Sequence, residues 1–174
     1  GGGTVLQGPG CLNYSLILQI ADNEKTGNIG TTNCHVMKTN RDALGQALGQ
    51  SVEIEGHTDL AIDGVKFSGN AQRRRRDALL FHGTILLGFD LPLIGQALRM
   101  PSCEPDYREG RSHETFCRNI PLTPEAVKQA LGQSWLCGGH APPIDAGKVQ
   151  RLAGEKYSRP DWIHRRAKRS QASE

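Results

Sequence analysis

The stretch TDLAIDGVKFSGNAQRRRRDALLFHGTILL, residues 58–87, predicts three consecutive strands around which we expect the rest of the chain to fold. The Asp-Gly pair at 63–64 is a signal for a two-residue hairpin turn, and the residues on both sides of it have strand character. Lys66 is therefore expected on a strand. After a polar break at Arg73–Arg76, residues 78–87 are expected to form the next, mostly apolar strand.

Four small residues follow the predicted strand position of Lys66. Residues 68–71 read SGNA, where a strand interior usually carries bulkier side chains. Such a pattern is typical of a place where a ligand or another backbone comes close. A lysine beside this floor of small residues, next to a strand that contains His82, predicts a site for an anion or an acyl group.

The charge distribution argues against nucleic-acid binding. The 174 residues carry a formal charge of +3, and much of the excess lies at residues 73–76 and 165–169. Aromatic residues do not alternate with these basic runs, as they do on many nucleic-acid platforms. We expect a solvated turn and a frayed terminus, within a chain long enough for one domain with its own core.

Cysteine usage and hydropathy indicate the compartment. The five cysteines are widely spaced, odd in number and without a CxxC pair. This pattern favours reduced thiols in a cytoplasmic protein over a disulfide scaffold or a zinc site, so no metal ligands are predicted. No apolar run approaches 18 residues and no signal-like segment opens the sequence, so we expect no membrane association.

Further elements are expected on both sides of the central stretch. Residues 1–6 and 11–20 are predicted as strands, and the glycines at the start either offer backbone amides to an anion or form a flexible terminus. The other predicted elements are a helix from 31 or 32 to 48, a strand at 52–55, a helix at 91–100 capped by Asp90, a polar loop at 101–113, a strand at 116–120, and helices at 123–136 and 145–157. A loop as long as 101–113 favours a functional role.

Three motifs resemble the lipoate-protein ligases of the biotin and lipoate ligase/transferase superfamily. They are GGGTVLQGPG at 1–10, DLAIDGVKFSGNAQ at 59–72 and FHGTILL at 81–87. The second is the most specific, because it reproduces the family's lysine-x-x-glycine-x-alanine spacing. The resemblance implies an α+β domain of the class II synthetase type, with a mixed, mostly antiparallel sheet and flanking helices.

The resemblance also implies the chemistry. A lipoate-protein ligase activates lipoate or octanoate with ATP and Mg²⁺ as an acyl-adenylate. It then transfers the acyl group to a lysine of a carrier, either a lipoyl domain of a 2-oxoacid dehydrogenase complex or the glycine cleavage H protein. By this resemblance residues 1–174 form a single, partial catalytic domain that lacks the first strands and helix of the family.

Roles for individual residues follow from the motifs. Lys66 is the expected catalytic cation, because joining a carboxylate to a phosphate crowds negative charge that a fixed cation stabilises. The other positions that match the family's substrate and adenylate contacts are Gly2, Gly3, Val5, Asp59, Ser68, Gly69, Ala71, Arg73, His82, Gly83 and Thr84. His82 has a second interpretation as a core histidine. Gln7-Gly8 stands where the family usually has a histidine-aspartate pair.

Two alternatives remain open from the sequence. One is an ATP-independent lipoyl or octanoyl transferase with a cysteine nucleophile, for which Cys103 lies in the loop that one branch uses. The sequence around Cys103 lacks that branch's Pro-Cys-Gly setting, and residues 50–57 contain no cysteine for the other branch. The second alternative is a protein that binds acylated carriers without catalysing the reaction.

Overall fold

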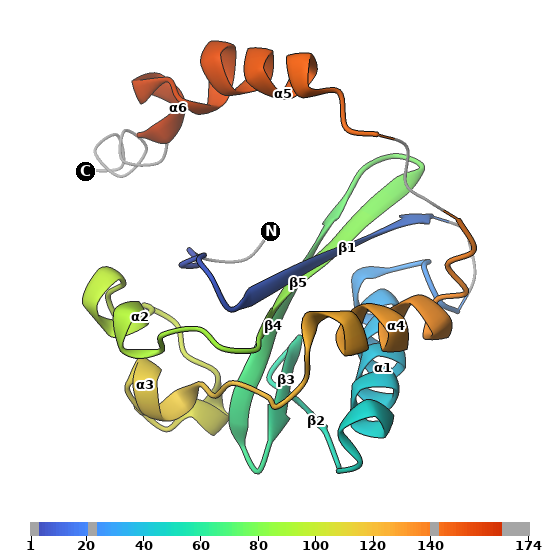
Figure 1. Cartoon of the computed structure of the whole chain (residues 1–174), viewed down its shortest axis with the longest axis vertical. Helices are drawn as coiled ribbons and strands as arrows, with labels where there is room; N and C mark the ends of the chain where they lie inside the picture. The colour runs from blue at the N-terminus through green and yellow to red at the C-terminus, as the bar shows by residue number, and fades with distance from the viewer. Residues whose placement is uncertain (1–3, 21–23, 140–142, 165–174) are drawn as a thin grey trace. The chain divides into compact units, whose positions relative to one another are not determined.

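Five antiparallel strands form one sheet in the order β1-β5-β4-β3-β2, with helices α1 and α4 packed together against one face (Figure 1). In this computed structural model, residues 4–20, 24–139 and 143–164 are described. The strands are β1 (Cys11–Gln19), β2 (Glu53–Glu55), β3 (Asp59–Ile62), β4 (Val65–Arg74) and β5 (Ala78–Leu86). The helices are α1 (Ile29–Leu48), α2 (Pro92–Ala97), α3 (His113–Phe116), α4 (Pro124–Ser134), α5 (Ala146–Leu152) and α6 (Pro160–Ile163), with a 3-10 turn η1 (Asp106–Arg108) and a π turn η2 (Ala153–Tyr157).

The chain divides into two compact units, Gly1–Cys137 and Gly138–Glu174. The first unit contains the whole sheet and helices α1 to α4. The second contains α5, η2 and α6. Asp145 caps the start of α5, and its Oδ1 accepts a hydrogen bond from the Lys148 amide at 2.9 Å. Within the residues that the structure describes, no helix is both long and apolar enough to cross a membrane.

The predicted three-strand meander is confirmed as β3, β4 and β5. Asp63 and Gly64 have φ angles of 52° and 68°, the left-handed values that a tight hairpin turn of the primed type needs. Strand β4 is longer than the sequence pattern indicated, because Arg73 and Arg74 are still paired with β5. The α+β class with an antiparallel sheet and flanking helices is confirmed as well.

A register shift between β3 and β4 places Gly69 on the same sheet face as Lys66. Leu60 lies opposite Ser68, but Ala61 lies opposite Lys66, so Phe67 is an extra residue on β4. An extra residue changes which sheet face the following side chains occupy. Phe67 and Ser68 are therefore both buried. Lys66 shares its face with its partner Ala61.

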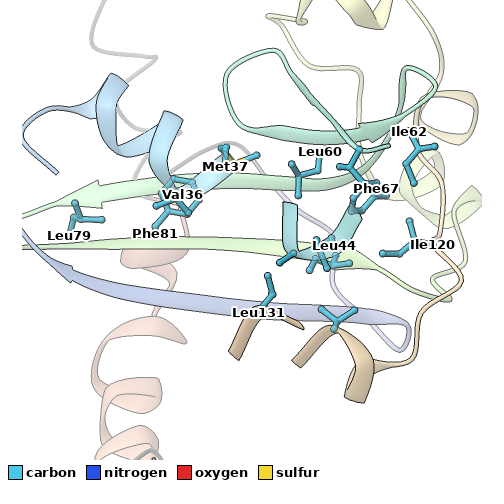
Figure 2. Packing of buried hydrophobic residues seen from close by; sticks show 14 residues of the cluster. Val36, Met37, Leu44, Leu60, Ile62, Phe67, Leu79, Phe81, Ile120 and Leu131 are labelled. Carbon is cyan, nitrogen blue, oxygen red and sulfur yellow. The ribbon is translucent and has the colours of Figure 1, made fainter. Parts of the chain in front are cut away.

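The core lies between the sheet and the two helices α1 and α4 (Figure 2). Strand β5 shows the alternation that such a half-covered sheet requires, because Leu79, Phe81 and Ile85 are each at most 1% exposed. Helix α1 contributes Val36, Met37 and Leu44, as Figure 2 shows. Burying each large apolar side chain contributes roughly 1.5 to 3 kcal/mol. Met37 is 1% exposed and belongs to this core.

Helix α1 begins earlier than expected because Asn28 caps it. The Asn28 side chain accepts a hydrogen bond from the Thr31 amide, and the Thr31 hydroxyl accepts one from the Asn28 amide. This reciprocal capping box satisfies amides that a helix start otherwise leaves unpaired. The helix ends at Gly49, which adopts the left-handed conformation with φ of 67°.

A chain of polar side chains crosses this apolar core. The Trp135 ring N–H donates to Asn40 Oδ1 at 2.8 Å, and the Asn40 amide donates to the Tyr14 hydroxyl at 2.8 Å. The Tyr14 hydroxyl in turn donates to Asn70 Oδ1 at 2.6 Å. The Asn70 amide donates to the Thr58 carbonyl at 2.8 Å, at the entry to β3. Burial raises the pKa of Tyr14, so its hydroxyl stays protonated and can donate.

Three local expectations are wrong. Residues 116–120 do not form a strand: Ser112 caps the short helix α3, and only Cys117 bridges to Lys66 afterwards. Asp90 does not cap the next helix, because α2 begins at Pro92 with Leu91 in the cap position. Of the strand predicted at residues 1–6, the described residues 4–6 run without strand pairing.

Candidate functional site

The face of the sheet turned away from α1 and α4 carries most of the predicted site residues. Along β5 the core-facing residues alternate with Leu80, His82 and Thr84, which therefore lie on this second face. Register across β1, β5 and β4 arranges the face in three rows. The rows are Asn13, Thr84 and Gly69; Ser15, His82 and Ala71; and Ile17, Leu80 and Arg73.

Lys66 and Asp59 form an ion pair at one end of this face. The distance from Lys66 Nζ to Asp59 Oδ1 is 2.8 Å, and the two side chains are 26% and 15% exposed. The lysine side chain lies over the backbone of Gly69. A Cβ atom at Gly69 would be only 3.0 Å from Lys66 Cε and Nζ, so the absence of a side chain at Gly69 leaves room for the ammonium group. The predicted placement of Lys66 beside the small residues 68–71 holds for Gly69.

Tyr107 completes the surroundings of Asp59. Its hydroxyl donates to Asp59 Oδ2 at 2.8 Å, while Oδ1 faces Lys66. Burial and the neighbouring Asp59 charge both raise the pKa of Tyr107, so the hydroxyl remains protonated and acts as a donor. Asp59 therefore lies between a cation on β4 and a hydrogen-bond donor on η1.

The connection after α2 is held beside Lys66 by an aromatic ring and two arginines. The Phe116 ring centroid lies 5.9 Å from Lys66 Nζ, 4.6 Å from Arg108 Cζ and 5.3 Å from Arg111 Cζ. Arg108 is buried, donates to the Arg111 carbonyl at 2.9 Å and has Glu104 at 3.6 Å. Arg108 and Arg111 of the loop predicted to be functional thus pack on the same aromatic ring as the predicted catalytic lysine.

Cys117 is the cysteine whose backbone pairs directly with Lys66. Burial raises the pKa of the Cys117 thiol, and the positive charges of Lys66 and Arg108 offset only part of this effect. A thiol with a raised pKa is mostly protonated at neutral pH and is a poor nucleophile. Cys103, considered from the sequence as a transferase nucleophile, is exposed.

Gln7 takes part in a ring of hydrogen bonds in the first row. Its amide donates to Thr84 Oγ1 at 2.9 Å, the Thr84 hydroxyl donates to Asn13 Oδ1 at 2.7 Å, and the Asn13 amide donates to Gln7 Oε1 at 2.9 Å. Gln7 is therefore bound to β5 through Thr84. In the next row, burial lowers the pKa of His82, which favours its neutral form at neutral pH.

The remaining predicted residues lie in different surroundings. Ser68 and Gly83 face the core side, where Ser68 is 1% exposed and the Asn70 and Tyr14 side chains occupy the space beside Gly83. Val5 is 60% exposed. Gly2 and Gly3 lie outside the described residues. The substrate contacts assigned to these residues, and to Asp59, Gly69, Ala71, Arg73, His82 and Thr84, stay predictions.

The arginine run contains one residue that is not a solvated turn charge. Arg74 donates to the Thr26 carbonyl at 2.7 Å and to Thr32 Oγ1 at 3.0 Å, and so binds β4 to the start of α1. Only residues 75–77 form the turn before β5. The interpretation of the whole run as solvated is therefore wrong for Arg74.

Tyr107, Arg108 and Phe116 were not among the sequence-predicted site residues. The length and polarity of the loop indicated a functional segment, but no periodic pattern marks which of its side chains reaches Asp59. Among residues 4–20, 24–139 and 143–164, no group of three or more His, Cys, Asp or Glu side chains is arranged to hold a metal ion.

Comparisons with known proteins identify a family for this chain. The family described as "Lipoyl protein ligase A/B catalytic domain" matches residues 1–134. Lipoate-protein ligase LplJ of Bacillus subtilis is 33% identical over 181 residues, covering 96% of this chain and 53% of that protein. Octanoyltransferase LipM of Symbiobacterium thermophilum is 42% identical over 128 residues, covering 62% of this chain and 44% of that protein. The chain spans about half the length of these curated relatives.

Solved structures share the fold. The putative lipoate protein ligase Ta0514 from T. acidophilum with bound lipoic acid has a TM-score of 0.72 at 20% identity, covering 93% of this chain and 68% of that one. A lipoate-protein ligase A bound with ATP has a TM-score of 0.69 at 20% identity, covering 88% and 64%. A bi-partite lipoate protein ligase described with its E2 lipoyl domain, from Thermoplasma acidophilum, has a TM-score of 0.68 at 22% identity, covering 93% and 67%.

Proposed function

The chain belongs to the lipoyl protein ligase A/B catalytic domain family, and from this premise we propose that it supplies the acyl-activating site of a lipoate-protein ligase. The proposed substrates are lipoate or octanoate and ATP with Mg²⁺, and the acceptor is a lysine of a carrier protein. The observation that carries the proposal is the Lys66 ammonium held over Gly69 by Asp59, on the sheet face that the core helices leave uncovered.

In the proposed first step, a carboxylate oxygen of the acyl substrate attacks the α-phosphorus of ATP. The bond from that phosphorus to the bridging oxygen breaks, and pyrophosphate leaves with the electron pair. Two anions approach each other in this step, so a fixed positive charge lowers the barrier. We assign that charge to Lys66, which is paired with Asp59 before an anionic substrate enters.

In the proposed second step, the carrier lysine attacks the acyl carbonyl of the adenylate. An amide bond forms, the mixed anhydride bond breaks, and AMP leaves while the attacking amine loses its proton. We propose lipoyl domains of 2-oxoacid dehydrogenase complexes and the glycine cleavage H protein as carriers, and a cytoplasmic location. The solved neighbour described with its E2 lipoyl domain supports a carrier of this kind.

A transferase is the second candidate, because octanoyltransferases are among the relatives. Two observations favour the ligase. The LplJ relative aligns over 96% of this chain, whereas the octanoyltransferase aligns over 62%. In addition, burial raises the pKa of Cys117, the thiol beside Lys66, which disfavours the thiolate that a transferase needs.

The need for ATP separates the two reactions. The complete protein is incubated with an apo lipoyl domain and octanoate, with and without ATP and Mg²⁺, and carrier mass is measured. A matched reaction replaces octanoate and ATP with octanoyl carried as a thioester on acyl carrier protein. The proposal predicts acylation only from free octanoate with ATP. Acylation from the thioester without ATP would instead establish the transferase.

A further inference from the structure

We propose that Tyr107 is a positioning residue for Lys66 that acts through Asp59. The inference rests on the proposed function only for its catalytic consequence. Asp59 has one carboxylate oxygen on each partner: Oδ1 at 2.8 Å from Lys66 Nζ and Oδ2 at 2.8 Å from the Tyr107 hydroxyl. A carboxylate held at both oxygens cannot rotate freely, so the direction in which it holds the ammonium is fixed.

Tyr107 is itself held firmly enough to act in this way. Its ring lies 5.0 Å from the Phe116 ring, centroid to centroid, and its backbone carbonyl accepts a hydrogen bond from Arg111. Arg111 also donates to the Gly64 carbonyl at 3.0 Å, in the hairpin turn that precedes Lys66. The Arg111 side chain thus joins the Tyr107 backbone to the turn before Lys66, in addition to the link through Asp59.

The backbone around Gly56 also restricts movement of the Tyr107 ring. A Cβ atom at Gly56 would lie 3.6 Å from Tyr107 Cε1, so the backbone before β3 borders the ring. The neighbouring Thr58 is fixed to Asn70 by three hydrogen bonds, of 2.6, 2.8 and 3.1 Å. The backbone on the N-terminal side of Asp59 is therefore held in place, and so is the Tyr107 hydroxyl that donates to its carboxylate. The loop that contains Tyr107 would in this way determine where the catalytic charge lies.

The experiment uses amine labelling, which does not depend on enzymatic activity. The complete protein is treated with a small amine-reactive reagent in the absence of ATP, and labelling of Lys66 is followed by peptide mass spectrometry. The variants are Tyr107→Phe, Asp59→Asn and the double variant. Tyr157→Phe is the matched control, because the Tyr157 ring also packs on another aromatic ring, that of Trp162.

Removing only the hydroxyl should release Lys66 while the ring keeps its place on Phe116. A hydrogen bond to a charged group is strong, so we expect labelling of Lys66 to accelerate severalfold to about tenfold in Tyr107→Phe. Asp59→Asn should accelerate the labelling of Lys66 at least as much. The double variant should match Asp59→Asn, because Tyr107 acts on Lys66 only through Asp59. Thermal unfolding should stay cooperative in each variant.

The inference would be overturned if Lys66 in Tyr107→Phe were labelled at the wild-type rate, or if the effects of the two substitutions on that rate were additive in the double variant. Pyrophosphate release is then measured as the second readout, where kcat should fall about tenfold with little change in KM for ATP. If the wild-type protein releases no pyrophosphate although labelling responds as expected, the proposed function fails and the positioning role stands. If release is normal and labelling does not respond, the positioning role fails alone.

Discussion

Replacing Gly83 by alanine should destabilise the fold strongly, because two other side chains already fill the space beside it. A Cβ atom there would lie 1.8 Å from Asn70 Oδ1 and 2.7 Å from Tyr14 Cε1. Tyr14, Gly83 and Asn70 are register partners on three adjacent strands, and the Tyr14 hydroxyl reaches across the glycine to Asn70. The added methyl group must displace one of these groups.

The magnitude follows from two contributions. Overpacking a well-filled core costs about 1 to 3 kcal/mol. If Asn70 swings away to make room, the Tyr14 hydroxyl loses its acceptor inside the core, which costs about 1 to 3 kcal/mol more. Together they give about 2 to 6 kcal/mol, a large part of the roughly 5 to 15 kcal/mol by which domains of this kind are stable.

Urea unfolding of Gly83→Ala and wild type, followed by circular dichroism, measures the difference. Gly132→Ala in α4 is the matched control, because a Cβ atom there meets nothing within 4 Å. Alanine in a helix interior is favoured over glycine by about 0.8 to 1 kcal/mol, so the control should gain stability. An unfolding free energy for Gly83→Ala within 0.5 kcal/mol of the wild type would refute the reasoning.

Four further substitutions test other parts of the chain. Tyr14→Phe should lose about 2 kcal/mol or more of unfolding free energy, because Asn40 loses an acceptor inside the core; equal urea midpoints would contradict this. Arg74→Ser should lower the free energy of unfolding by about 1 to 3 kcal/mol, because it removes the hydrogen bonds to Thr26 and Thr32. Arg75→Ser in the turn should change it by less than about 0.5 kcal/mol. Equal effects of the two substitutions would count against the contacts of Arg74. Cys103→Ser should leave ATP-dependent carrier acylation unchanged; an acyl thioester found on the wild type and absent from this variant would favour the transferase.

The local parts of the fold could be predicted from the sequence because local patterns determine them. The Asp-Gly pair fixed the hairpin at 63–64, and the small residues at 68–71 indicated the floor under Lys66. The lysine and Asp59 are only seven positions apart across a tight turn, so their meeting on one face follows from strand pairing. Residues 116–120 were misassigned because a short apolar run has the same pattern in a strand and in an irregular segment.

The long-range contacts could not be predicted in the same way. Tyr107 meets Asp59 from 48 positions away, and Trp135 meets Asn40 from 95 positions away. Local periodicity does not predict contacts between residues so far apart in the sequence. They depend on how the loop after α2 and the end of α4 pack on the sheet. The sequence predicts a turn charge at Arg74, because a run of four identical residues gives no sign that this side chain reaches α1.

The central claim, that Lys66 stabilises charge during acyl activation, is tested most directly by pyrophosphate release from Lys66→Ala in the complete protein. Lys128→Ala is the matched control, because that lysine forms an exposed ion pair with Glu125, a kind of pair worth about 0 to 1 kcal/mol. Losing a preorganised charge in the transition state should cost on the order of 3 to 4 kcal/mol, or a hundredfold or more in rate. We expect pyrophosphate release to be a hundredfold or more slower in Lys66→Ala and normal in Lys128→Ala. A folded Lys66→Ala protein with a near-normal rate of release would contradict a catalytic role for Lys66.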